Sequence, residues 1–229
     1  GMILGANGIK MGKRYPQYVV DPNVIVAKYG ADTLRLYEMF MGPLQESKPW
    51  DDNGVNGSRK FLDRVWRLLH EKQIIDGENK NLDAIYNATV KKVTEDYETL
   101  NFNTAISQMM IFVNALAKEE TLPKDMAEGF VKLLNPICPC ITEELWQFLG
   151  HNNTIAYEPW PTFDESKMVI DTIEIPIQVN GKFRGKITVL KSATGDEIKS
   201  KALAEVQTYV ATGYKKIIYV PGRIFNIVV

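Results

Sequence analysis

The stretch Ile173-Glu174-Ile175-Pro176-Ile177-Gln178-Val179-Asn180-Gly181-Lys182-Phe183 decides the fold of the C-terminal part of this 229-residue chain. Apolar side chains alternate along it, which predicts a strand that is buried on one face. Asn-Gly between two alternating segments is the strongest local signal for a β-hairpin, because both turn positions need a positive φ. Thr194 and Glu197 then form a capping-box pair that opens a helix, and two alternating segments run to the C-terminus. The order ββαββ predicts a small β-grasp-like domain over residues 171–229.

The region before this domain has a helical period instead. Between residues 58 and 150, apolar side chains recur every three or four positions over long segments. Four such segments, the last one interrupted by Pro136 and Pro139, predict an antiparallel helical bundle. Residues 151–170 have no clear period and predict a linker. The expected fold class is therefore α+β, a helical bundle followed by the small ββαββ domain.

Residues 1–57 contain the signals of two shorter helices. Asp21-Pro22 predicts a helix start, with proline in the first turn, and Gly30 predicts its end. Asp32 is expected to cap the second helix. Residues 43–57 are rich in Pro, Gly, Asn and Asp, which predicts a connector.

Composition excludes several classes of protein. The chain is 45% hydrophobic and 24% charged with a net charge of −1, which is typical of a globular protein and not of a strongly basic nucleic-acid binder. Residues 170–229 carry nine lysines and arginines against five acids, and this local excess fits a nucleic-acid-facing module. Cys138 and Cys140 are expected to be small, buried, reduced side chains, since two residues of that spacing make neither a relaxed disulfide nor a four-ligand metal site. We expect a cytoplasmic monomer with no metal site and no membrane contact.

The candidate catalytic element is a basic loop near the start. Lys10 and Lys13 stand among glycines at positions 5, 8 and 12. A flexible loop with two ammonium groups can close on a polyphosphate and follow its charge during a reaction. Most short basic loops are only solvated turns, so this signal needs support from the rest of the chain.

That support comes from a family resemblance. Lys10-Met11-Gly12-Lys13-Arg14 resembles the KMSKS loop of class I aminoacyl-tRNA synthetases. The run Tyr29-Gly30-Ala31-Asp32-Thr33-Leu34-Arg35 and, later, Asn101-Phe102-Asn103-Thr104-Ala105 resemble segments of leucyl-tRNA synthetase, bacterial type, in the same order. The resemblance covers nearly the whole chain and is to the C-terminal portion of that family.

The chain departs from the family pattern at three places. Gly12 and Arg14 stand where serines are usual, and a residue is inserted within 15–18. Pro136 and Pro139 match the family pattern, but the next position, which is usually histidine, is Cys140 in this chain. The lysines are retained, so the resemblance implies phosphate contact but no hydroxyl contact.

The resemblance also implies a function. The full enzyme of this family activates leucine with ATP and magnesium and transfers it to tRNA(Leu). Residues 1–57 would be the end of the catalytic region, 58–150 an anticodon-binding-type bundle, and 171–229 a tRNA-contacting domain. The chain has no HIGH-like segment, so we expect it to be inactive alone, with neither ATP nor magnesium bound to it.

Particular residues take roles from this resemblance. Lys10 and Lys13 are the expected catalytic residues, in contact with the triphosphate of ATP. The residues expected to contact tRNA are Arg59, Arg64, Lys182, Arg184, Lys186, Lys215 and Lys216. Because Lys182, Arg184 and Lys186 alternate, they are predicted to share one sheet face. A plain solvated surface is the simpler alternative for each of these cations.

The remaining aromatic residues are assigned to packing. Trp66 and Trp146 lie at core spacing, which favours burial over base stacking. Trp50 and Trp160 lie in connectors and are expected to pin them to the bundle. His70 and His151 have no partner that the sequence identifies.

Three alternatives stay open from the sequence. The chain could be a non-catalytic RNA-binding module, or a ubiquitin-like protein-interaction domain on a helical scaffold. It could also derive from the sister synthetases for valine, isoleucine or methionine, which share the helical bundle. The ββαββ tail and the run that begins at Tyr29 favour leucine.

Overall fold

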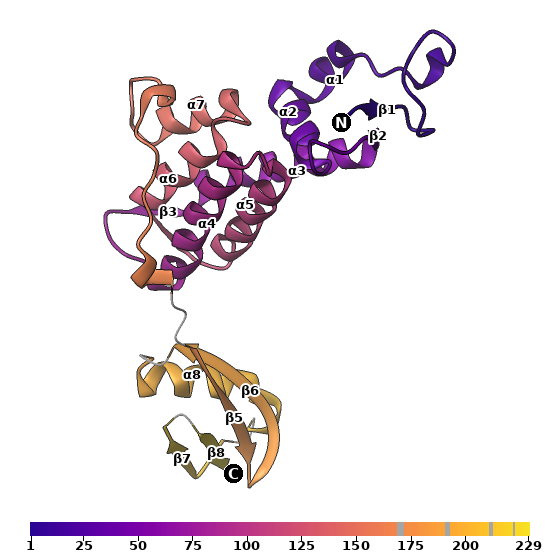
Figure 1. The fold of residues 1–229 in the computed structure, drawn as a ribbon. Coiled ribbons are helices and arrows are strands. Elements are labelled where there is room, and N and C mark those ends of the chain that lie inside the picture. Colours follow the sequence, from indigo (N-terminus) through magenta and orange to yellow (C-terminus); the bar gives the residue numbers. More distant parts are fainter. Residues whose placement is uncertain (169–171, 191–192, 211–212, 222) are drawn as a thin grey trace. The chain divides into compact units, whose positions relative to one another are not determined.

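The computed structural model describes residues 1–168, 172–190, 193–210, 213–221 and 223–229, and the chain divides into two units, Gly1–Met168 and Val169–Val229. The first unit is helical and the second is built on a four-stranded sheet (Figure 1). The α+β class expected from the sequence is confirmed. Within the described residues, no helix has the length and apolar character needed to cross a membrane.

A small core forms where the chain begins. Strand β1 (Ile3–Leu4) pairs in parallel with β2 (Lys48–Pro49), and the 3₁₀ helix η1 (Pro16–Tyr18) leads into α1 (Pro22–Tyr29) and α2 (Ala31–Phe40). The centre of this core is a cluster of four buried side chains, Ile25, Tyr37, Trp50 and Val55. The Trp50 indole donates to Asp52 at 2.9 Å and packs edge-on against Tyr37. Trp50 therefore pins its connector, although to the small N-terminal core and not to the core of the bundle as predicted.

The ends of α1 follow the sequence, but the start of α2 does not. Asp21 caps α1 by accepting from Asn23 N, and Gly30 ends it at a φ of 89° that favours glycine. Asp32 was expected to cap α2 and does not. Gly30 occupies that cap position, and Asp32 lies inside the helix, where it is buried.

The prediction of a connector over 43–57 is wrong for its second half. Helix α3 (Asp52–Glu71) already begins at Asp52 and is capped by Asp51, whose carboxylate accepts from Asn53 N. Position 54 lies within this helix and is occupied by glycine because a Cβ there would approach the Tyr37 ring to 2.5 Å. The glycine that suggested a loop is therefore needed for the close approach of α2 and α3.

The remaining helices complete the predicted bundle (Figure 1). They are α4 (Lys80–Glu98), α5 (Phe102–Leu116), α6 (Lys124–Leu134) and α7 (Pro139–Phe148). A parallel pairing of β3 (Gln73–Ile75) with β4 (Thr121–Pro123) ties two of the connections together. The break between α6 and α7 lies at the two prolines, as expected. Fully buried side chains fill the centre, among them Leu69, Val90, Met109, Phe112, Phe130 and Trp146.

The segment predicted as a linker is attached to the bundle as far as it is described. It contains two 3₁₀ helices, η2 (Ile155–Tyr157) and η3 (Glu165–Met168). The Trp160 indole donates to Thr94 Oγ1 at 2.8 Å, and Lys91 pairs with Glu165 at 2.8 Å. Trp160 thus pins this segment to α4, as predicted. Residues 169 and 170 of the predicted linker lie outside the described residues.

The second unit has the β-grasp arrangement that the sequence predicts. Its elements are β5 (Thr172–Val179), β6 (Lys182–Leu190), α8 (Gly195–Glu205), the 3₁₀ helix η4 (Gln207–Tyr209), β7 (Lys216–Val220) and β8 (Ile224–Val228). The sheet order is β6-β5-β8-β7, with β5 and β8 parallel and the outer pairs antiparallel. Asn180 and Gly181 form the hairpin turn with φ of 50° and 78°, and Thr194 with Glu197 forms the capping box.

One face of this sheet is covered by α8. Alternating β5 residues and the apolar side of α8 meet in a separate core made chiefly of Ile175, Ile177, Ile198, Ala202 and Phe225. These side chains are at most 3% exposed. The second unit therefore has a hydrophobic core of its own, which is the requirement for an independently folded domain.

Candidate functional site

The basic loop is held at its centre by Met11. The Met11 side chain packs against the small N-terminal core, and its Sδ accepts from Val20 N at 3.4 Å. The backbone of Lys10 forms a bridge with Leu4. Lys10 and Lys13 flank this anchor, are exposed, and form no ion pair with any described residue. The loop thus presents two free ammonium groups from a fixed point.

The cavity beneath the loop is not a phosphate site. It has a volume of about 180 Å³ and is lined mainly by Ile3, Met11, Val20, Leu34 and Trp50. Its single carboxylate belongs to Glu38, and burial raises the pKa of this group while Arg35 lowers it. Neither candidate lysine lines it. This cavity therefore does not connect the candidate lysines to a phosphate site.

Arg59 and Arg64, on α3, are both engaged within the fold. Arg59 donates to Tyr29 O at 3.2 Å and pairs with Asp63 at 2.9 Å. Arg64 donates to Asn114 on α5 at 2.6 Å. The two arginines contact different neighbours, so they do not form one patch. Their predicted tRNA contact is untested and competes with these intramolecular bonds.

Trp66 does not belong to the core, contrary to the prediction from its spacing. Its side chain is 40% exposed, whereas Trp146 is 1% exposed as predicted. The Trp66 ring lies 4.3 Å from His70, and His70 lies 4.0 Å from Phe148 on α7. Helical spacing alone does not show whether a residue lies at the edge or at the centre of the apolar face of α3. These three rings form an exposed stack between α3 and α7.

The most tightly built polar site is the junction of α2 with the break between α6 and α7. The Asp32 carboxylate accepts from Cys140 N at 3.3 Å and from Ile141 N at 2.7 Å, so it caps α7 from 108 residues away. Arg35, one turn later, donates to Ile137 O at 2.7 Å and to Pro136 O at 2.8 Å. The Asp32 carboxylate thus accepts from amides in the first turn of α7, and the Arg35 guanidinium donates to carbonyls just after the end of α6.

Sequence reasoning assigned Asp32 a local role and missed this junction. The available signals were the spacing of Asp32 and Arg35, which puts both on one helix face, and the two prolines, which free the amides and carbonyls of a helix break. What no single sequence reveals is that these groups meet. The site is structural: it fixes the N-terminal helices on the bundle.

The two cysteines differ, although the sequence predicted both to be buried. Cys138 is buried and Cys140 is exposed, and neither forms a disulfide. Burial raises the pKa of the Cys138 thiol, and the nearby charge of Asp32 raises that of Cys140. Raised pKa values keep both thiols protonated and unreactive.

His151 also has partners that the sequence did not identify. Its Nε2 lies 2.8 Å from Glu128 Oε1, and its ring stacks on Trp146 at 3.7 Å. His70 contacts Trp66 O through Nδ1 at 2.8 Å. Both histidines thus serve packing and local hydrogen bonding.

In the second unit, the prediction that three cations share one face is wrong. A bulge between Ile177 and Gln178 leaves Arg184 without a register partner on β5. The Arg184 guanidinium lies 4.4 Å from the centre of the Tyr209 ring, whereas Lys186 pairs with Glu174 on the sheet at 2.8 Å. A β-bulge adds one residue and so breaks the alternation that placed these side chains together.

The other cations of this unit lie on opposite edges of the sheet. Lys182 begins β6 and Lys216 begins β7, and these are the two outermost strands. Three strand spacings of about 4.8 Å separate them. Lys182, Lys215 and Lys216 are exposed and form no ion pair with a described residue. Among the cations predicted to contact tRNA, these three of this unit remain available to an external anion.

Two comparisons with known proteins agree with this fold. A family model described as the anticodon-binding domain of tRNA ligase matches residues 79–200, which is just over half of the chain. The structure is also similar to a leucyl-tRNA synthetase, AgnB2 of Agrobacterium radiobacter K84, solved as a ternary complex with tRNA and LeuAMS. That match has 33% sequence identity and a TM-score of 0.65, and it covers all of this chain and 32% of the synthetase.

The chain therefore spans about a third of the length of the protein that it matches. The resemblance to the C-terminal portion of leucyl-tRNA synthetase, noted from the sequence, is confirmed. The chain belongs to the family of anticodon-binding domains of tRNA ligases.

Proposed function

We propose that this chain is the C-terminal, tRNA-binding part of a leucine–tRNA ligase. The observation that carries this proposal is the match of the whole chain, at 33% identity, to one third of a synthetase solved with tRNA. The partner is tRNA(Leu), and leucine and ATP are substrates of the full enzyme. We also expect the protein to be a monomer in the cytoplasm.

The roles of the two candidate catalytic residues rest on their exposure. Lys10 and Lys13 are unpaired among the described residues and stand on an anchored glycine-containing loop, so they fit the triphosphate of ATP. ATP supplies the activated phosphate bond, and the lysines offset negative charge on the departing pyrophosphate. The described residues contain no cluster that could hold a metal ion.

For tRNA contact, the unpaired cations are the better candidates. Lys182, Lys215 and Lys216 are free to contact backbone phosphates, while Arg59, Arg64, Arg184 and Lys186 must first leave partners within the protein. Phosphate contacts supply affinity and orientation and carry no sequence information. The isolated chain would then act as an RNA-binding module, which is the alternative left open by the sequence.

Binding of labelled tRNA(Leu), compared with the tRNAs for valine, isoleucine and methionine, tests the proposal. We expect the chain to bind tRNA(Leu) at low salt and to prefer it, and to catalyse no leucine-dependent pyrophosphate exchange alone. Absence of tRNA binding at low salt would contradict the tRNA-binding role. A preference for one of the other three tRNAs would assign the chain to a sister enzyme.

A further inference from the structure

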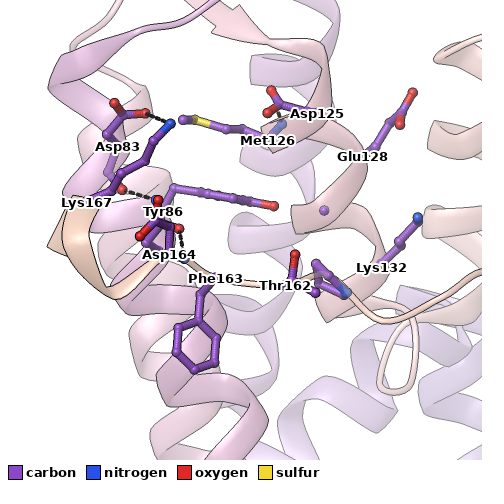
Figure 2. Close-up of a pocket in the computed structure, with 13 residues that line it drawn as sticks. Asp83, Tyr86, Asp125, Met126, Glu128, Lys132, Thr162, Phe163, Asp164 and Lys167 are labelled. Carbon is purple, nitrogen blue, oxygen red and sulfur yellow. Dashed lines mark hydrogen bonds and ion pairs between the residues drawn. The ribbon is translucent and has the colours of Figure 1, made fainter.

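A pocket of about 410 Å³ lies between α4, α6 and the segment 161–167 (Figure 2). Its residues are distinct from all those considered above for ATP or tRNA. The volume falls within the range of small-molecule sites. The pocket therefore has the size of a ligand site without an assigned ligand.

The third wall of this pocket is firmly attached. Asp164 N donates to Asn87 Oδ1 on α4 at 2.7 Å, and the Asp164 carboxylate accepts from Ser166 N and Oγ at 2.9 and 2.6 Å. Lys91 pairs with Glu165 at 2.8 Å. These bonds hold the segment against the helix and give the pocket a defined shape.

Tyr86 has a largely buried side chain whose hydroxyl opens on the pocket. It is 8% exposed, and its hydroxyl extends from α4 toward Gly129 on α6 (Figure 2). A Cβ at Gly129 would come within 1.8 Å of the hydroxyl oxygen, so the glycine leaves the space that this group occupies. The hydroxyl has no hydrogen-bond partner among the described residues. The oxygen is not among the fully buried unsatisfied atoms of the described residues, so it is open to the pocket and to a ligand there.

The lining of the pocket is negatively charged. Its ionisable side chains, apart from the tyrosine, are Asp83, Asp125, Glu128, Asp164, Lys132 and Lys167. Lys132 is turned to other partners, with Nζ 3.8 Å from Glu158 and 5.2 Å from the Trp146 ring centre. Lys167 lies 3.7 Å from Glu78. Four carboxylates against two lysines leave the lining with two excess negative charges, although Glu128 also contacts Lys124 at 3.9 Å and His151 at 2.8 Å outside the lining. This excess favours a cationic ligand.

Two of the carboxylates act directly on the tyrosine. Burial raises the pKa of Tyr86, and the charges of Asp125 and Glu128 raise it further. The phenol therefore stays protonated and neutral, and its oxygen remains a hydrogen-bond acceptor in a negative potential. An ammonium group is the natural donor to such an oxygen.

A second acceptor, the carboxylate of Asp83, lies on the α4 wall, whereas the Tyr86 hydroxyl reaches the α6 wall at Gly129. Asp83 Oδ1 is buried without a hydrogen bond and forms only a long ion pair, 4.0 Å, with Lys167 Nζ, for which a ligand ammonium would compete. The carboxylates are too dispersed for a single inorganic ion, since the described residues contain no cluster with metal-binding geometry. A ligand that reaches both walls must therefore be an extended organic cation.

We propose that this pocket binds a small aliphatic diamine. One ammonium donates to the Tyr86 hydroxyl beside Asp125 and Glu128. The other lies near Asp83, and the alkyl chain passes along Met126 between them (Figure 2). The two positive charges of the ligand match the two excess negative charges of the lining.

Calorimetric titration of the whole chain with putrescine, at low salt and without RNA, tests the proposal. We expect saturable one-to-one binding of putrescine, weaker binding of the monoamine butylamine, and no competition by magnesium. Undetectable binding of putrescine at millimolar concentration would overturn the proposal. Tighter binding of Nα-acetyl-lysine amide would also overturn it, because the site would then take a protein side chain.

Two variants locate the binding in this pocket. Tyr86→Phe removes only the hydroxyl, and Asp125→Asn removes one charge at the rim; each is expected to weaken putrescine binding about tenfold. Glu98→Gln, on an exposed position of the same helix as Tyr86, is the matched control and should leave the affinity unchanged. Thermal unfolding verifies that each variant is folded. Wild-type affinity in both pocket variants would place the diamine elsewhere and contradict the proposal.

Discussion

The helix junction and the basic loop use charged side chains in opposite ways. At the junction, Asp32 and Arg35 are bound to four backbone groups of the α6–α7 break. In the loop, Lys10 and Lys13 are exposed and unpaired among the described residues. The difference separates two roles: engaged charges hold the N-terminal helices on the bundle, and free charges remain for an external anion.

The largest effect is expected from breaking the junction. Asp32→Ala leaves two amides of α7 without their acceptor in a buried place, which we expect to cost about 3 kcal/mol of stability. The matched control is Asp21→Ala, which removes an exposed cap from α1 and should cost about 1 kcal/mol. Urea unfolding measures both. Equal losses of stability in the two variants would show that the long-range cap by Asp32 stabilises the fold no more than an exposed local cap.

Substitution of a loop lysine should lower the activity of the full enzyme and leave the stability of the fold unchanged. Lys13→Ala in the full enzyme is expected to lower the rate of pyrophosphate exchange by about 100-fold, the usual scale for one group that stabilises transition-state charge. Its unfolding midpoint should match wild type, because the side chain has no partner among the described residues. Pyrophosphate exchange and urea unfolding on the same preparation measure both quantities. A stability loss comparable to that of Asp32→Ala would remove the distinction between the two regions.

Much of this architecture follows from the sequence. The helical period, the Asn180-Gly181 turn and the capping box before α8 predicted the bundle and the ββαββ unit, because each is a local signal. The start of α3 was missed, since Gly54 resembles a loop residue unless its contact with Tyr37 is known. The role of Asp32 was missed for the same reason, since its partners are more than 100 residues away.

The candidate site was less predictable than the fold. The lysines of the loop and of β6 and β7 could be singled out in the sequence as local positive charge. The bulge at Arg184 and the engagement of Arg59 and Arg64 are not visible, because they depend on register and on side chains from other elements. Exposure of Trp66 likewise depends on where α7 ends beside α3.

Two glycines of α3 compare a close contact between helices with an open surface position. Gly54→Ala should destabilise the protein by about 2 kcal/mol, because the new Cβ would meet the Tyr37 ring at 2.5 Å. Gly57→Ala should stabilise it by up to about 1 kcal/mol, since no atom lies within 4 Å and alanine favours the helix. Unfolding midpoints of the two variants test this pair. Effects of the same sign would contradict the packing of α2 on α3.

A smaller, pH-dependent effect is expected at Glu38, between the two regions. Burial raises the pKa of its carboxyl in the folded protein. The contribution of protonated Glu38 to the free energy of unfolding is therefore complete below its unfolded pKa. It is lost as pH rises through its folded pKa. Glu38→Gln should stabilise the protein slightly at neutral pH, and less in acid. Solvent screening keeps the change to a fraction of a kcal/mol, and a larger gain in acid than at neutral pH would contradict it.

The most direct test of the central claim, that unengaged cations contact tRNA, is the salt dependence of tRNA(Leu) binding measured by fluorescence anisotropy. The comparison is between wild type, the double variant Lys182→Ala/Lys216→Ala, and Arg64→Ala, whose guanidinium is already bound to Asn114. We predict that the double variant lowers the slope of log K against log salt by about two, and that Arg64→Ala leaves it nearly unchanged. An unchanged slope in the double variant, or a larger loss in Arg64→Ala, would contradict the account.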